Sequence, residues 1–182
     1  MRAYLIGLVL LVSLAPATAR ADAFGGWRFT APAGFAVTKG GDHVEFMKVT
    51  APTFCQLALY AARPATRSPA EEAAFEWKNV VEKVCEATDV KPLGGGTSRS
   101  AVPYQATSAV VSAGGNSFYA IHYVVAPAKV VSSVLLLSNS AATIGDCKPV
   151  AKAFLDGLAL EQAAAPGAAP APAAAAGSPV GR

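Results

Sequence analysis

The two histidines are the first candidates for catalysis or metal binding, because imidazole titrates near neutral pH and ligates metal ions. His43 follows Asp42 at the start of an expected strand, and His122 alternates with apolar residues within another. A zinc site needs three or four ligands close together, and neither histidine has a third Cys, Asp or Glu at ligand spacing. Histidine on an apolar strand face is more often a hydrogen-bonded residue of the core or its rim. We therefore predict no metal, no cofactor and no catalytic residue.

The three cysteines, Cys55, Cys85 and Cys147, permit one disulfide bond and one remaining thiol, in three possible pairings. Cys85 falls on the apolar stripe of an expected helix, where a free cysteine behaves as a small hydrophobic residue. Cys55 is expected on the core side of a strand and Cys147 at the start of the last helix. We predict a bridge between Cys55 and Cys147, stabilising the fold by on the order of 4 to 5 kcal/mol. Because no C-x-x-C motif is present and no histidine neighbours a cysteine, we expect a structural rather than a redox-active bridge.

Other residues that could do chemistry fall in patterns with ordinary structural roles. The run Gly94-Gly95-Gly96 lacks the Lys-Ser/Thr of a P-loop and lacks a following helix, which indicates a flexible loop. No G-x-S-x-G motif is present, although a serine nucleophile can also be positioned by the fold alone. The dense glutamates belong to the solvated face and cap of a helix rather than to a paired acid and base. They are Glu71, Glu72, Glu76, Glu82 and Glu86.

The amino terminus has the pattern of a secretory signal peptide. Arg2 precedes an apolar run at residues 3–14, and small residues at 17–21 form two overlapping A-x-A cleavage sites. The run is shorter than the roughly 20 residues that a membrane-spanning helix needs. No cysteine lies in the cleavage region to accept a lipid. We expect residues 1–21 to be removed and the mature protein to be periplasmic or extracellular, with no transmembrane segment.

The carboxyl terminus, residues 162–182, consists mainly of alanine, proline and glycine and contains no aromatic residue. Such a segment lacks large apolar side chains whose burial could offset the entropy cost of ordering it, and its prolines oppose a helix. We expect a disordered tail there. It either serves as a spacer or has no function and reflects the drift of a genome biased toward Ala and Pro codons. Residues 22–161 are left as a single folded domain.

The folded block shows strand and helix signals in a definite order. Alternating or apolar runs predict strands at 27–30, 35–39, 43–50 and 54–61. A helix is expected at 69–87, because Ser68, Pro69 and Glu71 form a capping box with proline at the first position. Residues 89–103 are rich in Gly, Pro and Ser and predict a loop. The remaining expected elements are a hairpin of 104–113 and 117–126 around Gly114-Gly115-Asn116, a central strand at 130–138, and a helix at 147–158 capped by Asp146.

This order predicts an α+β fold with a mainly antiparallel sheet and two principal helices packed on it. The chain resembles the Mog1/PsbP-like group of domains, and the features that carry the resemblance are spread over most of residues 24–160. They are the opening Trp27, Phe29, Pro32, Gly34 and Phe35, the helix after a strand ending at Tyr60, the Gly-Gly-Asn hairpin into 119–125, and the strand at 134–138 before the closing Phe154-Leu155-x-Gly157-Leu158 helix. The resemblance implies a Mog1/PsbP-like sandwich. It also implies a role in protein binding or as an accessory or envelope factor, with no catalytic residue set to transfer.

Composition and charge narrow the function further. The chain has 15 basic and 12 acidic residues and a formal net charge of +3, so it lacks the excess of cations that nucleic-acid binding requires. We expect an exported, monomeric, non-catalytic binding or accessory module whose partner is a protein or envelope component. Contact is expected through the hairpin, the loop at 89–103, or an aromatic patch including Tyr119 and Tyr123. The alternative is a small secreted hydrolase or transferase whose catalytic residues the sequence does not reveal.

Overall fold

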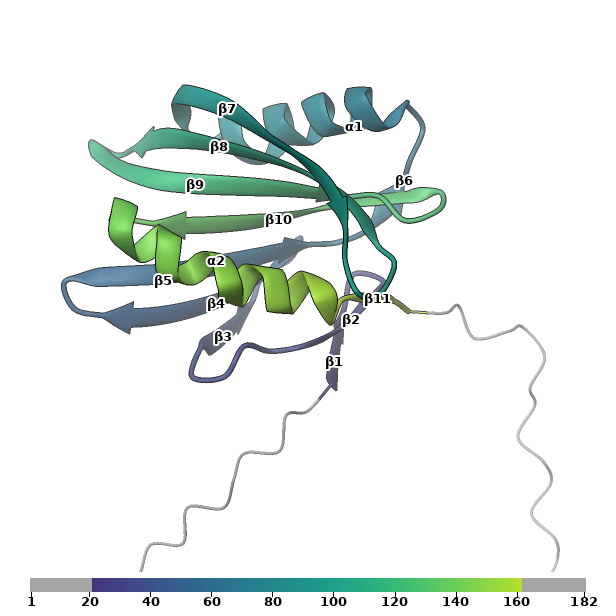
Figure 1. The fold of residues 1–182 in the computed structure, drawn as a ribbon, viewed down its shortest axis with the longest axis horizontal. Helices are drawn as coiled ribbons and strands as arrows, with labels where there is room; N and C mark the ends of the chain where they lie inside the picture. The colour runs from purple at the N-terminus through teal and green to yellow at the C-terminus, as the bar shows by residue number, and fades with distance from the viewer. Residues whose placement is uncertain (1–20, 162–182) are drawn as a thin grey trace, which may run out of the picture.

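The computed structural model describes residues 21–161. The expected tail and, apart from Ala21, the expected signal peptide lie outside the described residues. Within this range the fold is α+β, with mainly antiparallel strands and two helices, as the sequence predicts (Figure 1). The helices are α1 (Pro69–Glu76), which continues as a π-helical segment η1 (Trp77–Glu82), and α2 (Ala141–Asp156).

The described strands form two sheets. The larger, of eight strands, has the order β3-β4-β5-β10-β9-β8-β7, with β6 paired to β10 beside this path, and the smaller has the order β1-β2-β11. β10 is central, pairing with β5 on one side and β9 on the other, as its continuous apolar run predicts. The bounds are β1 (Ala21–Phe24), β2 (Trp27–Thr30), β3 (Ala36–Lys39), β4 (His43–Thr50), β5 (Thr53–Tyr60), β6 (Arg63–Pro64), β7 (Glu86–Thr97), β8 (Pro103–Ala113), β9 (Asn116–Val125), β10 (Val130–Ser138) and β11 (Ala159–Leu160).

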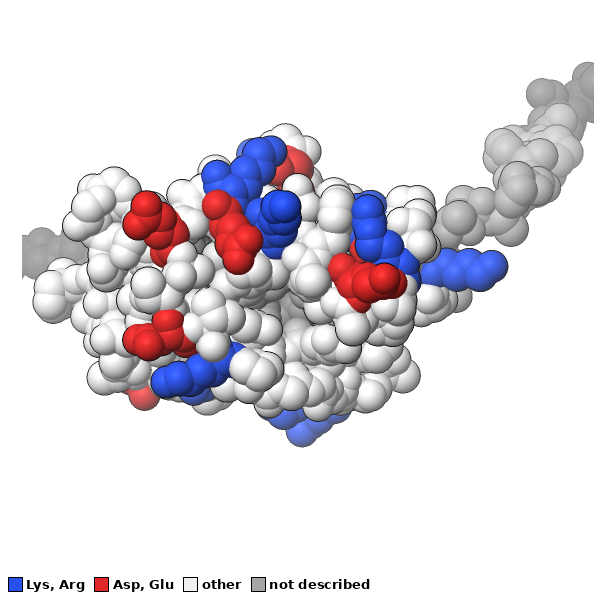
Figure 2. All heavy atoms as spheres, turned by 90° about the horizontal axis from the view of Figure 1, so that it is seen from above, with Lys and Arg blue, Asp and Glu red and all other residues white. Residues whose placement is uncertain are grey.

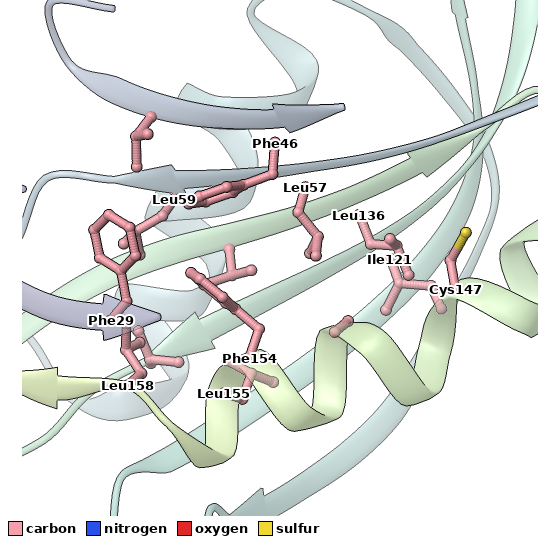
Figure 3. Packing of buried hydrophobic residues seen from close by; sticks show 14 of the residues in the cluster. Phe29, Phe46, Leu57, Leu59, Ile121, Leu136, Cys147, Phe154, Leu155 and Leu158 are labelled. Carbon is pink, nitrogen blue, oxygen red and sulfur yellow. The ribbon is translucent and has the colours of Figure 1, made fainter. Parts of the chain in front are cut away.

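The main hydrophobic core lies between α2, the smaller sheet and one face of the larger sheet (Figure 3). Three phenylalanines meet there, with ring centroids 5.2 to 5.8 Å apart: Phe29 of β2, Phe46 of β4 and Phe154 of α2. A disulfide bond joins Cys55 of β5 to Cys147 of α2 across 92 positions of sequence. The closing helix is thus attached to the sheet by both packing and a covalent bond.

A second core covers the opposite face of the larger sheet. Val80 and Val81 of η1 pack there on Leu135 of β10 and on small residues of the neighbouring strands. Because side chains alternate along β10, Leu135 faces this core while Val134 and Leu136 face the first. Cys85, the free cysteine, is partly buried beside the second core, and burial raises the pKa of its thiol.

The first helix begins as predicted but ends early. Ser68 accepts a hydrogen bond from the backbone of Glu71, and the Glu71 side chain accepts one from the backbone of Ser68. The α-helical geometry stops at Glu76 and gives way to η1, so the expectation of an α-helix over residues 69–87 is wrong in its second half. Val80 and Val81 pack on the sheet, but Glu72 and Glu76, which the sequence placed on the solvated face and cap, are buried, so the predicted faces of this helix are wrong in part. The apolar pattern also did not indicate the wider π-helical turn.

Two further expectations are wrong. Residues 89–103 are not a loop, since most of them belong to β7, an edge strand paired with β8 through two register shifts. Proline and glycine are tolerated at a sheet edge with bulges, so these residues gave a misleading loop signal. The last helix begins at Ala141 with Ser140 as its cap, rather than after Asp146. Gly145 and Pro149 lie inside α2, and both weaken the helical pattern in the sequence.

Candidate binding groove

An apolar groove of about 450 Å³ lies between α2 and the strands β7, β8 and β9. We call it the α2 groove, defined by six of its lining residues: Leu93, Tyr104, Ile121, Tyr123, Lys148 and Leu155. A second hollow of about 290 Å³ adjoins it and shares Ile121 and Lys148 with it. The main groove has the size of a small-molecule binding site.

The alternation of β9 places its two tyrosines on the groove side. Tyr119, Ile121 and Tyr123 share one face of the strand, and the first of these lines the second hollow while the other two line the α2 groove. Ala120 and His122 point to the opposite face, where they meet η1. The aromatic patch predicted from Tyr119 and Tyr123 therefore lies along the groove.

The glycine run predicted as a flexible loop instead makes room for a groove residue. Gly96 is paired across the sheet with Tyr104, and a Cβ atom at Gly96 would lie 2.7 Å from the Tyr104 hydroxyl oxygen. A Cβ atom at Gly95 would lie 3.0 Å from the Tyr104 carbonyl oxygen. Because neither glycine has a side chain, the tyrosine ring can lie against the backbone of β7.

Two phenol groups lie in the α2 groove without a hydrogen-bond partner in residues 21–161. The rings of Tyr104 and Tyr123 meet edge to face, with centroids 6.0 Å apart. Burial raises the pKa of Tyr123 to about 12, with a smaller effect from Tyr104. The Tyr123 phenol is therefore protonated at physiological pH and can donate a hydrogen bond to a ligand.

The charges along α2 differ in how far they are already paired. Lys152 Nζ lies 3.0 Å from Asp156 Oδ2. Asp156 also accepts a hydrogen bond of 2.9 Å from the backbone of Arg99, and these two donors lower the pKa of its carboxyl group. Lys148 makes no ion pair or hydrogen bond with residues 21–161. The α2 groove thus carries one uncommitted cation, at the point where it meets the second hollow.

The loop between β7 and β8 attaches to the carboxyl end of α2 (Figure 1). Ser100 Oγ donates a hydrogen bond of 2.6 Å to the carbonyl of Leu158, in addition to the contact between Arg99 and Asp156. Ser98 Oγ accepts a bond of 3.1 Å from the backbone of Val102, which fixes the shape of the loop. These bonds hold the β7–β8 hairpin at a set distance from α2, and therefore set the width of the groove.

A buried polar chain on the opposite face contains the only serine, histidine and carboxylate that meet within residues 21–161. Ser133 Oγ donates to Glu76 Oε2 at 2.6 Å, and His122 Nε2 lies 2.9 Å from Ser133 Oγ. Since the hydroxyl hydrogen goes to the carboxylate, His122 must be the donor to Ser133. Burial lowers the pKa of His122 to about 4, so the imidazole is neutral near pH 7.

The order of this chain is unlike that of a catalytic triad. In a triad the histidine accepts the serine proton, whereas here the glutamate accepts it and the histidine donates. Ser133 is 0% and His122 2% exposed, so no substrate can reach the hydroxyl. Arg63 completes the network by donating to Glu76 and Glu72, and this contact is the main reason why the pKa of Glu72 falls to about 2. The network connects α1 and β6 to the middle of the sheet.

The other residues singled out from the sequence lie apart from the groove. His43 Nδ1 lies 2.8 Å from Asp42 Oδ1 at the surface, and its ring packs on Tyr60. Among residues 21–161, no group of three metal-ligating side chains is arranged to hold an ion. In the same range, no helix is long and apolar enough to cross a membrane.

Charge on the face that carries α1 and β7 is mixed. Figure 2 shows Lys and Arg side chains next to Asp and Glu side chains across this face, with no large area of one sign there. This face therefore lacks the cluster of cations that binding to a nucleic-acid backbone requires.

Sequence reasoning found part of the groove and missed the rest. It proposed Tyr119, Tyr123 and the segment that contains Leu93, and the structure brings all three to one surface. It did not propose Tyr104 or Lys148. Lys148 falls within the helix expected at 147–158, but no local pattern shows that it lies beside β7 and β9.

No protein-family model matches the chain, and the comparison with curated proteins also gave no match. Among solved structures, the chain is similar to the cyanobacterial PsbP of Synechocystis, with 12% identity, a TM-score of 0.48, and coverage of 78% of this chain and 91% of that one. It is also similar to LpqN of Mycobacterium tuberculosis, described as involved in cell envelope biogenesis, with 11% identity, a TM-score of 0.48, and coverage of 74% and 82%. The solved structures that the chain resembles thus include a PsbP, as the sequence led us to expect, and the likeness is one of fold.

Proposed function

We propose that this protein is an exported, non-catalytic accessory module of the cell envelope or extracellular space, and that it binds an envelope component in the α2 groove. The observation that carries the proposal is the groove itself, a preformed apolar surface with a few polar groups directed into it. The hydrogen bonds from Ser100 and Arg99 to the end of α2 support it, because they hold the two walls in place before any ligand arrives.

The proposal includes the organisation inferred from the sequence. Residues 1–21 form a cleaved leader, residues 22–161 a monomeric domain of the Mog1/PsbP-like sandwich type, and residues 162–182 a disordered tail. The bridge between Cys55 and Cys147 suits an oxidising compartment, where such bonds persist. Ser133 gives no support to the alternative of a secreted hydrolase or transferase, because its hydroxyl is buried and donates to Glu76.

Export is tested by the intact mass of the protein isolated from its native cells. The expected product lacks the leader, so its amino terminus lies close to Ala21. It is recovered from the periplasm or medium with one disulfide bond. Full-length protein recovered from the cytosol with three free thiols would contradict the proposal.

The groove is tested by the variant Leu93→Glu, which places a charge on its apolar wall. Leu93 is 53% exposed, so the substitution should leave the fold intact. The matched control is Val84→Glu, because Val84 is 65% exposed and lies next to η1, away from the groove. Envelope extracts passed over the immobilised mature proteins should yield a component that wild type and Val84→Glu retain and Leu93→Glu loses. Equal capture by Leu93→Glu and wild type would exclude the groove as the binding site.

A further inference from the structure

The α2 groove and its neighbouring hollow follow α2 as one track. Residues that line them recur along the helix from Ile144 to Asp156, and Lys148 belongs to both. From Lys148 to Asp156 the helix rises about 12 Å, at about 1.5 Å per residue. The part of the track beyond Lys148 is lined by Pro149 and Leu155 of α2, by Leu93, Tyr104 and Tyr123 of the strands, and by the ion pair of Lys152 and Asp156. Its apolar surface suits an unbranched hydrocarbon chain.

The charged groups of the track differ in whether they are paired. Lys148 stands where the two hollows meet and has no anionic partner within residues 21–161. Asp156, the carboxylate at the other end, already binds Lys152 and the backbone of Arg99. The second hollow is lined by a further lysine, Lys91, and by the carboxylate of Asp89. The charge of the α2 groove that lacks a partner within residues 21–161 is therefore positive and lies where the groove meets the second hollow.

Two further groups in the groove lack partners. The phenols of Tyr104 and Tyr123 make no hydrogen bond within residues 21–161, and they can donate to an oxygen atom of a bound ligand. An apolar groove surface, the unpaired Lys148 and two neutral phenol donors together match a molecule with a single acyl chain and an anionic oxygen head.

We propose that the α2 groove binds a free fatty acid, with its carboxylate at Lys148 and its acyl chain extending along α2 toward Leu155. This inference rests on the proposed binding function of the groove and specifies its ligand. The energy comes mainly from burying the chain, and the ammonium group selects for an anionic head.

Calorimetric titration of the mature protein with four soluble probes tests the inference. Decanoate carries the chain and the anion, decanol the chain alone, decyltrimethylammonium the chain with a cation, and butyrate the anion with a short chain. We expect decanoate to bind at least about tenfold more tightly than each of the others. Equal binding of decanoate and decyltrimethylammonium would overturn the role of Lys148, and binding of butyrate as tight as that of decanoate would overturn the role of the apolar surface.

Variants locate the binding. Lys148→Met should weaken decanoate at least about tenfold and change decanol less than about twofold, whereas the control Lys78→Met, an exposed lysine of η1, should change neither. Leu93→Glu should weaken both ligands. Thermal unfolding of each variant shows whether it is folded. Decanoate binding that Lys148→Met leaves unchanged, or that Leu93→Glu leaves unchanged, would overturn the inference.

The outcomes separate this inference from the function on which it rests. If wild type does not bind decanoate, but Leu93→Glu still loses an envelope component that Val84→Glu retains, the groove is a binding site and the fatty-acid assignment is wrong. If Leu93→Glu loses neither decanoate nor an envelope component, the inference and the proposed function are both wrong.

Discussion

Ser133 donates a hydrogen bond of 2.6 Å to Glu76, and this bond joins the central strand β10 to the last residue of α1 inside the protein. Both residues are buried, and the Ser133 hydroxyl oxygen also accepts a hydrogen bond from His122 Nε2. Arg63 holds the second oxygen of Glu76 from β6. The buried polar side chains on the α1 side thus form a continuous chain of hydrogen bonds, in which each group is the hydrogen-bond partner of its neighbour.

Replacing Ser133 by alanine should therefore destabilise the fold by about 1 to 3 kcal/mol, because a buried N–H and a buried carboxylate oxygen each lose their partner. The control is Ser112→Ala, whose hydroxyl lies 3.3 Å from Ser117 at the surface, and it should change stability by less than about 0.5 kcal/mol. Urea unfolding followed by circular dichroism measures both. Equal midpoints for the two variants would show that the buried chain contributes no stability.

The buried histidine should make stability fall in moderately acidic solution. The pKa of His122 is lowered from 6.5 to about 4 in the folded protein, so the unfolded chain binds more protons between these values. Stability should drop as pH falls from about 6.5 to about 4, by on the order of 3 kcal/mol at most. His122→Gln should remove this part of the dependence, whereas His43→Gln should keep it. If the urea midpoints of wild type and His122→Gln changed equally with pH across this range, His122 would not be the group responsible for the loss of stability.

Local signals in the sequence predicted the elements whose shape is set locally. The capping box at Ser68 begins α1, the Gly114-Gly115 turn joins β8 and β9, and the continuous apolar run of β10 places that strand in the centre of the sheet. In each case a few adjacent residues fix the local geometry or burial. These predictions therefore did not need knowledge of the tertiary structure.

The rest depends on partners that lie far away in the sequence. β7 is a strand only because β8 supplies its hydrogen bonds, and its Gly96 leaves room for one side chain, that of Tyr104. The partner of His122 is Ser133 on β10. The partner of Ser133 is Glu76, which the sequence predicted on the solvated face of a helix. The groove likewise needs Leu93 and Lys148 on facing walls, which no local pattern can place.

The disulfide bond gives a second stability test. Reduction of the bond between Cys55 and Cys147 frees a loop of 92 positions and should cost on the order of 4 kcal/mol. The double variant Cys55→Ala, Cys147→Ala should unfold identically with and without reductant, whereas Cys85→Ser should respond to reductant as wild type does. Non-reducing peptide mapping provides the independent check. A linkage that contains Cys85 would show that the pairing is different in the protein isolated from its native cells.

The close approach of Gly96 and Tyr104 predicts that a single methyl group will disturb the α2 groove. In Gly96→Ala the new Cβ atom would lie 2.7 Å from the Tyr104 hydroxyl oxygen and 2.8 Å from the ring carbon that bears it, so the ring must move away from β7. Such overpacking should cost about 1 to 3 kcal/mol. Gly41→Ala is the matched control, because nothing lies within 4 Å of a Cβ atom at that position.

A double-mutant cycle with Tyr104→Ala separates this clash from a change in the backbone of β7. If the ring is the cause, Gly96→Ala should cost little in the Tyr104→Ala background, and the two substitutions should be strongly non-additive in urea unfolding. The same displacement should make the affinity of Gly96→Ala for decanoate differ from that of wild type, since Tyr104 lines the groove and is paired with Gly96. Additive effects, or a Gly96→Ala variant as stable as Gly41→Ala, would mean that the tyrosine does not depend on the missing side chain.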